Sequence, residues 1–224
     1  MGDAEPERRA RGRKPLVYRG DELHCTRALE DKAHADGYAV VAGMDEVGRG
    51  ALCGPVVACA VVLGDAFDST GLDDSKRLTA LKREELSARV REKAVAFSVG
   101  VADPREIDRL NILKATHLAM VRAVAGLRVG PDVILVDALT VPGVSTPQRP
   151  IVKGDALSVS IAAASIVAKV ERDALMREWD RRYPGYGLAQ NMGYASQLHR
   201  EALRQMGPTE IHRRSFHGTE RWLF

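Results

Sequence analysis

The sequence predicts an α/β fold built on a mixed β-sheet. Two apolar segments rich in Val and Ala in the first half of the chain indicate paired strands, and a third segment there is a further candidate strand. Helical and strand-like segments then alternate, which is the pattern of an α/β protein. The length of 224 residues allows one large domain, or one domain with an appendage.

The predicted strands are short and bounded by turn residues. They cover residues 38–45, 55–63, 95–101 and 133–136, and the last of them ends at Asp137. If the first and last of these strands are parallel neighbours, their carboxyl ends bring Asp45 and Asp137 together. Ligands of open α/β sheets bind beyond such strand ends.

The predicted helices show helical spacing of apolar residues. They cover residues 79–93, capped by Thr79, 111–127, capped by Asn111, 158–182 and 196–206, with a short helix outside the core over 21–34. In the long helix a single apolar stripe is expected, made of Ile161, Ala164, Ala168, Leu175 and Trp179. The alanines at the start of this helix allow it to approach a sheet closely.

The charge distribution divides the chain into parts. The formal net charge is +3, and residues 1–20 alone hold six basic and three acidic residues. We expect a disordered basic arm over 1–20, a helix and linker over 21–37, a core domain over 38–190 and a helical appendage over 191–224. The basic residues of this arm can add non-specific affinity for phosphates, but a solvated tail without a binding role accounts for the same composition equally well.

Several protein classes are excluded by composition. No apolar run approaches the roughly 20 residues that span a bilayer, and the polar N-terminus lacks a secretory signal. Three cysteines, Cys25, Cys53 and Cys59, form no C-x-x-C pair, which argues against a disulfide framework or a zinc site. A cytoplasmic protein without membrane contact is therefore expected.

Carboxylates follow the apolar segments at three separate places. Asp45 and Glu46 come directly after Val40–Gly43, Asp137 ends a strand, and Asp155 precedes the long helix. Oxygen ligands without nearby His or Cys favour Mg²⁺ or Mn²⁺ over zinc. Two such ions can activate a water and stabilise the leaving oxygen of a phosphodiester.

A glycine-rich turn adjoins the first two carboxylates. The glycines of Gly48-Arg49-Gly50 permit close approach of the backbone to a ligand, and the arginine offers a charged fork for phosphate. A tight turn alone would explain this tripeptide, so its position beside Asp45 and Glu46 is what makes it informative.

Ordered blocks of the sequence resemble the bacterial ribonuclease HII family, the type 2 ribonucleases H. The matching blocks run in order from about residue 40 to 217 and comprise residues 43–50, 54–56, 72–78, 111–112, 115–117, 136–137, 153–155, 160–173, 183–187 and 193–194. The resemblance implies a ribonuclease H-like mixed five-stranded sheet flanked by helices, with a small C-terminal helical appendage. Fewer than 40 residues precede the first strand, which fits type 2 better than type 3.

The resemblance also implies an activity and the residues responsible for it. The activity is endonucleolytic cleavage of RNA in RNA–DNA hybrids and of single ribonucleotides in duplex DNA, by a monomer using two Mg²⁺ or Mn²⁺ ions. By the resemblance, Asp45, Glu46, Asp137 and Asp155 bind the metal, and the backbone of Gly48, Arg49 and Gly50 senses the ribose 2′-hydroxyl. Tyr194 packs on the sugar at the RNA-to-DNA junction, and Ser75 and Lys76 lie near the substrate backbone.

Other interpretations remain open at this point. Another metal nuclease or strand-transfer enzyme on the same fold would share the carboxylates without needing a 2′-hydroxyl, and a non-catalytic binding module would show no metal-dependent turnover. Arg213, Arg214 and His217 could contact phosphates or form a solvated face. Lys169, Arg172 and Asp173 are expected in ion pairs. The terminal residues Trp222, Leu223 and Phe224 could dock in a sliding-clamp pocket, but an ordinary packed C-terminus is preferred.

Overall fold

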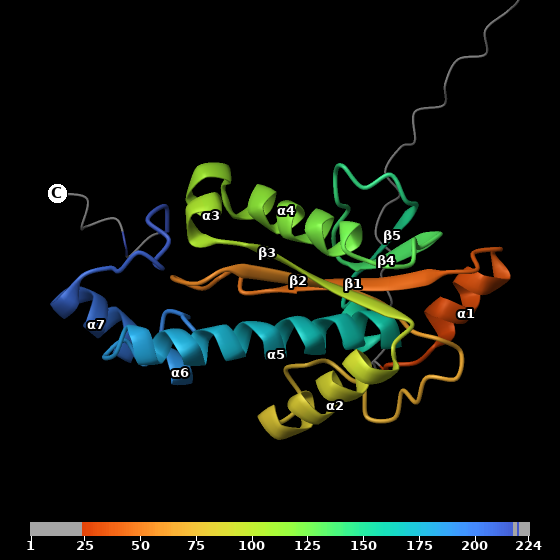
Figure 1. Ribbon diagram of the computed structural model, residues 1–224, viewed down its shortest axis with the longest axis horizontal. Coiled ribbons are helices and arrows are strands. Elements are labelled where there is room, and N and C mark those ends of the chain that lie inside the picture. The colour runs from red at the N-terminus through yellow and green to blue at the C-terminus, as the bar shows by residue number, and fades with distance from the viewer. Residues whose placement is uncertain (1–23, 217–218, 220–224) are drawn as a thin grey trace, which may run out of the picture.

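A five-stranded mixed sheet forms the centre of the protein (Figure 1). The structure is a computed structural model and describes residues 24–216 and residue 219. The strands are β1 (Val41–Val47), β2 (Val56–Val62), β3 (Ala96–Ala102), β4 (Val133–Asp137) and β5 (Gln148–Ile151), in the order β3-β2-β1-β4-β5. The mixed sheet expected from the sequence is confirmed.

Helices cover both faces and both ends of the sheet. They are α1 (Ala28–Ala35), α2 (Ala80–Lys93), α3 (Pro104–Leu110), α4 (Ile112–Ala125), α5 (Val159–Arg182), α6 (Leu188–Asn191) and α7 (Gln197–Met206), with a 3₁₀ turn at Gly154–Ala156. Within the described part of the chain, none of these helices is long and apolar enough to cross a membrane.

The strand pairing fixes where the carboxyl ends lie. β2 pairs antiparallel with β1 and with β3, whereas β4 pairs parallel with both β1 and β5. The parallel β1–β4 pair aligns Met44 with Val136. The expected parallel neighbours are therefore present, and the next residue of each strand, Asp45 and Asp137, lies at the same edge.

Two helical layers enclose the sheet, with α4 on one face and α5 with α2 on the other (Figure 1). Close contact between α5 and β1 depends on Gly43, because a Cβ atom there would lie 2.1 Å from the carbonyl carbon of Ser160. The N-terminal half of α5 is thus held against the strand that bears Asp45. Thr79 and Asn111 cap α2 and α4 as expected, since their side chains accept from the N–H groups of Lys82 and Lys114.

The long helix α5 differs from the single stripe expected. Every residue from Val159 to Ala168 is buried, whereas Leu175 and Trp179 are only half-buried. Because α2 and α1 cover the side of α5 that faces away from the sheet, its first three turns have no solvent-facing side. A stripe is a property of a helix covered on one side only.

The short N-terminal helix also differs from the expectation of a helix outside the core. α1 begins at Ala28 and packs Leu29 and Ala33 into a cluster with residues of β1, β4 and α5. The buried carboxylate of Glu30 accepts from the N–H of Ser160 at 3.0 Å. α1 therefore closes the start of α5 as part of the core.

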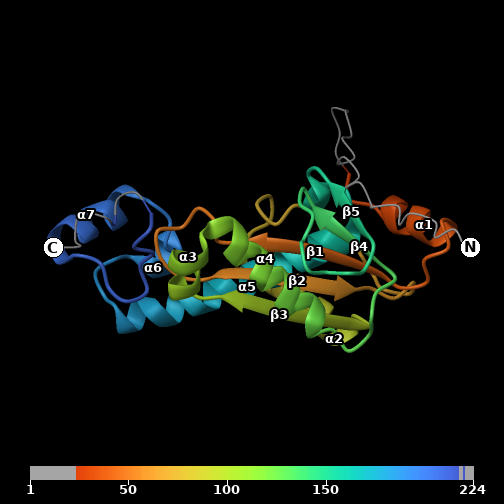
Figure 2. The same cartoon turned by 90° about the horizontal axis from the view of Figure 1, so that it is seen from above.

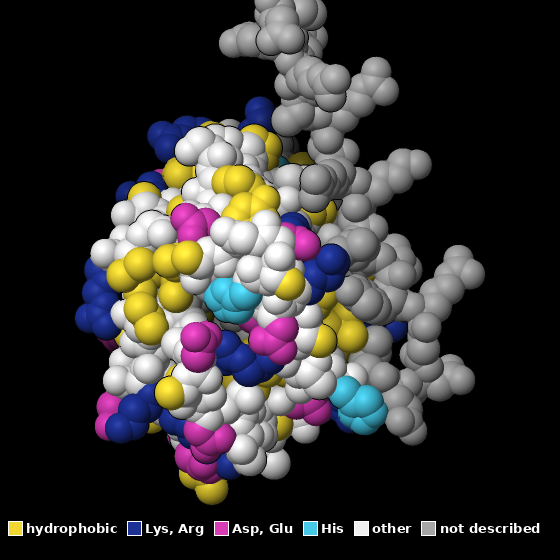
Figure 3. Space-filling view, turned by 90° about the vertical axis from the view of Figure 1, so that its right-hand side faces the viewer, with side chains coloured by type: hydrophobic (Ala, Val, Ile, Leu, Met, Phe, Trp, Pro, Cys, Tyr) yellow, Lys and Arg dark blue, Asp and Glu magenta, His cyan; other side chains and the backbone are white. Residues whose placement is uncertain are grey.

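The two ends of the molecule differ in character. α6 and α7 lie at one end, around the last turns of α5, and α1 lies at the other (Figure 2). A separate apolar cluster joins the C-terminal helices to Leu52, Cys53 and Met176. On the end that holds α1, the described acidic and basic side chains are interspersed (Figure 3).

Candidate active site

Three separate segments place the predicted carboxylates at one edge of the sheet. Asp45 and Glu46 end β1, Asp137 ends β4, and Asp155 belongs to the 3₁₀ turn before α5. The N–H of Gly154 donates to Asp137 Oδ1 at 2.7 Å, which joins this turn to the end of β4. The sequence prediction that these carboxylates converge agrees with this geometry.

The carboxylates are withdrawn from water and close to one another. Burial, followed by the charges of Glu46 and Asp137, raises the pKa of Asp45 well above its ordinary value. Burial also raises the pKa of Glu46 against the opposing charge of Arg49, and the pKa of Asp137 against the Gly154 hydrogen bond. The ionised cluster is consequently unfavourable without nearby cations.

Among the described residues, the side-chain cations that pair with this cluster lie at its periphery. Lys76 Nζ lies 3.1 Å from Asp155 Oδ2, and Arg49 Nη1 lies 3.1 Å from Glu46 Oε1. Glu46 Oε2 is buried and has no hydrogen-bond partner among the described residues. A set of oxygen ligands with an unpartnered buried oxygen fits one or more Mg²⁺ or Mn²⁺ ions.

A cleft of about 440 Å³ opens beside the carboxylates. Its lining includes nine of the ten residues predicted from the sequence, namely Asp45, Glu46, Gly48, Arg49, Gly50, Ser75, Lys76, Asp137 and Tyr194. Asp155 is buried next to it and meets the lining through Lys76. Val47, Arg83, Ser165 and Lys169 complete the wall and were not singled out as site residues by the sequence.

The glycine turn and Tyr194 form one side of this cleft. Gly48 has φ +94°, and a Cβ atom there would lie 2.2 Å from Nε of Arg172, so the position requires glycine. A Cβ atom at Gly50 would lie 4.0 Å from Cε1 of Tyr194, which places the turn beside the tyrosine ring. Tyr194 is 38% exposed, and the Arg172 guanidinium lies 5.4 Å from the centre of its ring.

Ser75 and Lys76 differ in what they present to the cleft. The Ser75 hydroxyl is buried and lies 3.0 Å from the hydroxyl of Ser165, while Arg83 donates to the Ser75 carbonyl at 2.9 Å. These contacts anchor the loop to α5 and α2. The Lys76 side chain, in contrast, is 80% exposed, and its ammonium group reaches the carboxylate of Asp155.

Two buried arginines lie beneath the glycine turn. Arg213 is fully buried and donates to the carbonyls of Gly48, Arg49 and Gly54 at 2.7, 2.9 and 2.9 Å. Neither a phosphate contact nor a solvated face, the two interpretations drawn from the sequence, describes this side chain, since it is surrounded by main chain. Arg214 is exposed, and His217 lies outside the described residues.

Arg172 also differs from the ion pair expected of it. It is fully buried and donates to the carbonyls of Pro55, Met192 and Cys53 at 2.8–3.1 Å. Lys169 and Asp173 do form the expected ion pair, at 2.7 Å. No local feature of the sequence predicts these contacts, because Arg213 lies 165 residues from Gly48 along the chain.

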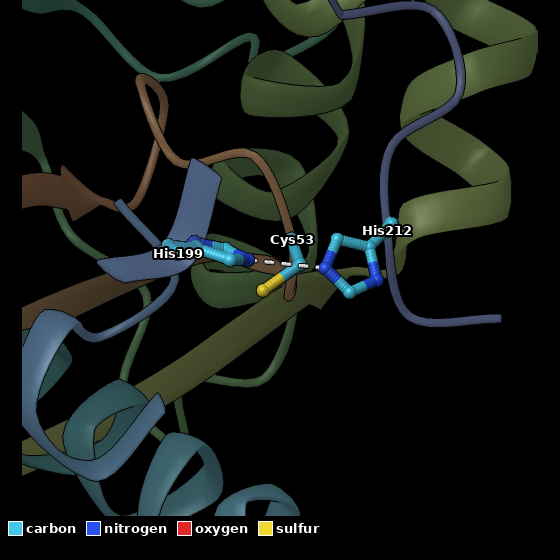
Figure 4. Close-up of side chains that lie close together, drawn as sticks. All are labelled: Cys53, His199 and His212. Carbon is cyan, nitrogen blue, oxygen red and sulfur yellow. Dashed lines mark hydrogen bonds between the residues drawn. The ribbon is translucent and has the colours of Figure 1, made fainter. Parts of the chain in front are cut away.

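Cys53, His199 and His212 form a second cluster of potential metal ligands, all within 4.8 Å of one another (Figure 4). His199 Nδ1 lies 2.9 Å from the Tyr194 carbonyl and must donate to it. The N–H of Thr209 donates to His212 Nδ1, so His212 carries its proton on Nε2 and donates to His199 Nε2 at 3.1 Å. Because every ring nitrogen takes part in a hydrogen bond, His199 and His212 form a neutral hydrogen-bonded pair, called here the histidine strut, which binds the Tyr194 main chain.

Comparison with known proteins gives consistent matches. The family model described as Ribonuclease HII matches residues 42–219. Ribonuclease HII of Desulfitobacterium hafniense strain Y51 is 54% identical over 187 residues, which are 84% of this chain and 72% of the relative. The ribonuclease H2 structure from Pyrococcus horikoshii OT3 has a TM-score of 0.68 at 29% identity, covering 81% of this chain and 96% of that one. A chain in the PCNA:RNase HII complex from Archaeoglobus fulgidus has a TM-score of 0.68 at 26% identity, covering 79% and 95%.

Proposed function

Because this chain belongs to the ribonuclease HII family, and is thus a metal-dependent ribonuclease H acting on RNA–DNA hybrids, we propose that it also incises duplex DNA at single embedded ribonucleotides. The observation that supports the proposal is the shared cleft, which combines a carboxylate cluster with the glycine turn and Tyr194. Hydrolysis needs the carboxylates, and recognition of one sugar needs groups that approach that sugar closely. Because the carboxylates and the glycine turn with Tyr194 adjoin the same cleft, a single bound strand could contact both groups.

In the proposed mechanism, Asp45, Glu46, Asp137 and Asp155 hold two divalent ions. When bound, these ions supply activation of a water and stabilisation of the leaving 3′ oxygen. The parallel pairing of β1 with β4 fixes where Asp45 and Asp137 lie, and burial limits the access of water to Asp45. Lys76 and Arg49 lie at the rim, where their charges suit the flanking phosphates.

The proposed nucleophile is water rather than the ribose hydroxyl. Its oxygen bonds to phosphorus while the bond from phosphorus to the 3′ oxygen breaks, so the products carry a 3′-hydroxyl and a 5′-phosphate. The cut falls on the 5′ side of an isolated ribonucleotide. The 2′-hydroxyl is then a recognition element, read by the backbone of Gly48–Gly50, with the Tyr194 ring against the neighbouring sugar.

The role that follows is removal of misincorporated ribonucleotides and RNA primers in the cytoplasm, by a monomer. The relative from Archaeoglobus fulgidus forms a complex with PCNA. In this chain Trp222, Leu223 and Phe224, the residues considered for a sliding-clamp contact, lie outside the described part. We propose no clamp contact.

The test is incubation with a duplex carrying one ribonucleotide, with Mg²⁺, with Mn²⁺ and with chelator, followed by identification of the product ends. We expect metal-dependent cutting 5′ of the ribonucleotide and no cutting of an all-DNA duplex. A 2′,3′-cyclic phosphate would show attack by the hydroxyl and reject the mechanism. Cutting of all-DNA duplex would indicate a different nuclease, and absence of turnover with either metal would indicate a binding module.

A further inference from the structure

Burying the charged guanidinium of Arg213 costs free energy of folding, and this side chain has no function in the mechanism above. It is fully buried, and among the described residues it forms no ion pair with a carboxylate. Burial, followed by the charge of Arg172, lowers its pKa to about 9. A buried charge is costly unless hydrogen bonds satisfy it, so the partners of this guanidinium are informative.

Those hydrogen bonds go to a single loop. Arg213 donates through Nη2, Nη1 and Nε to the carbonyls of Gly48, Arg49 and Gly54. It therefore binds the beginning and the end of the turn that follows β1. The fork is rigid and planar, which fixes the direction of each carbonyl that it binds. The loop is therefore positioned by a side chain from the far end of the sequence.

The direction of these carbonyls determines the direction of the next two N–H groups. No peptide bond in the described chain is cis, and in a trans peptide the C=O and N–H point in opposite directions. Since the carbonyls of Gly48 and Arg49 point inward to Arg213, the N–H groups of Arg49 and Gly50 point away from it. Neither N–H has a hydrogen-bond partner among the described residues, and both residues line the cleft.

We propose that Arg213 is a positioning residue for sugar recognition: it turns the Gly48–Arg49 and Arg49–Gly50 peptides so that two adjacent N–H donors face the ribose 2′-hydroxyl. Successive N–H groups of this kind form a concave donor site for an oxygen ligand. The positive charge behind the carbonyls also polarises both peptides and strengthens their N–H donors. The inference rests on the proposed function, because it assumes that this turn reads the 2′-hydroxyl.

The variant Arg213→Lys keeps a long basic side chain but removes the planar guanidinium, and an amine cannot hold three carbonyls in fixed planar directions. The matched control is Asp108→Ala. Asp108 accepts from the N–H groups of Arg214 and Ser215, so its loss loosens the same C-terminal segment without removing the guanidinium. Melting temperatures of both variants establish that each is folded and how far the segment is weakened.

The measurement is the affinity for a duplex with one ribonucleotide and for the same all-DNA duplex, in Ca²⁺ to bind substrate without turnover. We expect Arg213→Lys to lower the preference for the ribonucleotide by about 3- to 10-fold, the value of roughly one net hydrogen bond. Asp108→Ala should keep the wild-type preference. An unchanged preference in folded Arg213→Lys, or an equal fall in Asp108→Ala, overturns the proposal.

A second measurement covers the case in which Arg213→Lys does not fold. In the wild-type protein, the amide NMR signals of Arg49 and Gly50 should move when the ribonucleotide duplex is added, and much less with the all-DNA duplex. Equal responses would overturn the inference. If wild type cleaves the ribonucleotide duplex in Mg²⁺ but either measurement fails, only the inference is lost; if it does not cleave, the proposed function falls as well.

Discussion

Two buried charged regions adjoin the cleft, and they differ in where their compensation comes from. In the described part of the chain, the carboxylates of Asp45, Glu46 and Asp137 have cations only at their periphery, and burial raises the pKa of each. Arg172 and Arg213 are fully buried but bind six main-chain carbonyls between them. We predict that the acidic region is completed by a bound metal ion, whereas the hydrogen bonds of the basic region are supplied by the fold.

This difference implies opposite responses to loss of charge. Neutralising a carboxylate should reduce the electrostatic repulsion within the metal-free cluster and so stabilise the fold, but it also removes a predicted metal ligand. Replacing a buried arginine should leave carbonyls unsatisfied, which costs about 1–3 kcal/mol for each buried group. Activity and stability are therefore expected to change in opposite directions in the acidic region and in the same direction in the basic region.

The strongest test of the acidic region is Asp45→Asn. We expect cleavage of the single-ribonucleotide duplex in Mg²⁺ to fall by about 10³-fold or more, which is roughly 4 kcal/mol of transition-state stabilisation. The melting temperature of the metal-free protein should rise by a few degrees, about 2–4 °C for each kcal/mol regained. Both are measured on the same preparation, one by product formation and one by thermal unfolding.

The control is Asp132→Asn, at the opposite end of the sheet. Asp132 accepts from the N–H groups of Ala39 and Val40, and an amide oxygen can continue to do so. This variant should retain activity and gain no stability. Near-normal turnover by Asp45→Asn would contradict the assignment of Asp45 as a metal ligand.

Acidification should distinguish the acidic region from the histidine strut beside the basic one. Burial, followed by the repulsion that a protonated His199 would exert, lowers the pKa of His212 from 6.5 to about 4. The unfolded chain therefore binds this proton first. The stability that depends on neutral His212 is fully present above pH 6.5 and is lost as the pH falls toward 4, by roughly 3 kcal/mol in all.

The carboxylates contribute with the opposite sign in the metal-free protein. Their folded-state pKa values are raised, so protonation on acidification adds stability. Unfolding by denaturant is followed between pH 7 and 4 in wild type and in His212→Asn, whose side-chain oxygen can still accept from the Thr209 N–H. Since the carboxylates are common to both proteins, the difference curve isolates the histidine, and parallel curves would refute its role.

Tyr194 lies where the two regions meet, and Tyr194→Ala tests its part in recognition. Aromatic contacts with nucleotides contribute about 1–3 kcal/mol, so cleavage at a single ribonucleotide should fall roughly 5- to 150-fold. Continuous RNA–DNA hybrid should be affected less, and the melting temperature should barely change because the ring is 38% exposed. Tyr194→Phe separates the contribution of the hydroxyl from that of the ring.

The control is Tyr183→Ala, since Tyr183 donates to Glu210 at 2.6 Å and does not line the cleft. It should leave the ratio of the two activities unchanged. If Tyr194→Ala lowers both activities equally and strongly lowers the melting temperature, Tyr194 is a packing residue and the recognition role is wrong.

The acidic region could be predicted from the sequence, for a local reason. Each carboxylate directly follows an apolar segment or precedes a helix, and parallel strands bring their carboxyl ends together whatever the rest of the fold. Helix caps at Thr79 and Asn111 are equally local and are confirmed. The capping box of Asp103 and Glu106 was a readable signal for α3 that the sequence analysis missed.

The basic region could not be predicted, because nothing local distinguishes a buried arginine from a surface one. Arg213 meets Gly48 only after the C-terminal segment returns along residues 52–54. β5 was not placed for a related reason: its sequence, Gln148–Ile151, contains a proline and polar residues that suit an edge strand but lack apolar alternation. The roles of the site residues themselves remain predictions.

The smallest expected effect concerns Lys76, which with Arg49 is one of the two described cations paired with the acidic region. Burial opposes its charge, but the hydrogen bond and charge of Asp155 prevail and raise the pKa of Lys76. Because its side chain is 80% exposed, the contact is screened and worth at most about 1 kcal/mol. Lys76→Met should therefore raise Mn²⁺ affinity by about 5-fold or less, measured by titration calorimetry without substrate, while the KM for substrate rises.

Lys169→Met is the matched control, since Lys169 also lines the cleft but pairs with Asp173, and it should change Mn²⁺ affinity less. Weaker Mn²⁺ binding by Lys76→Met would mean that Lys76 supports the metal site rather than competing for Asp155, and the contrast between a region completed by ligand and one completed by the fold would no longer hold there.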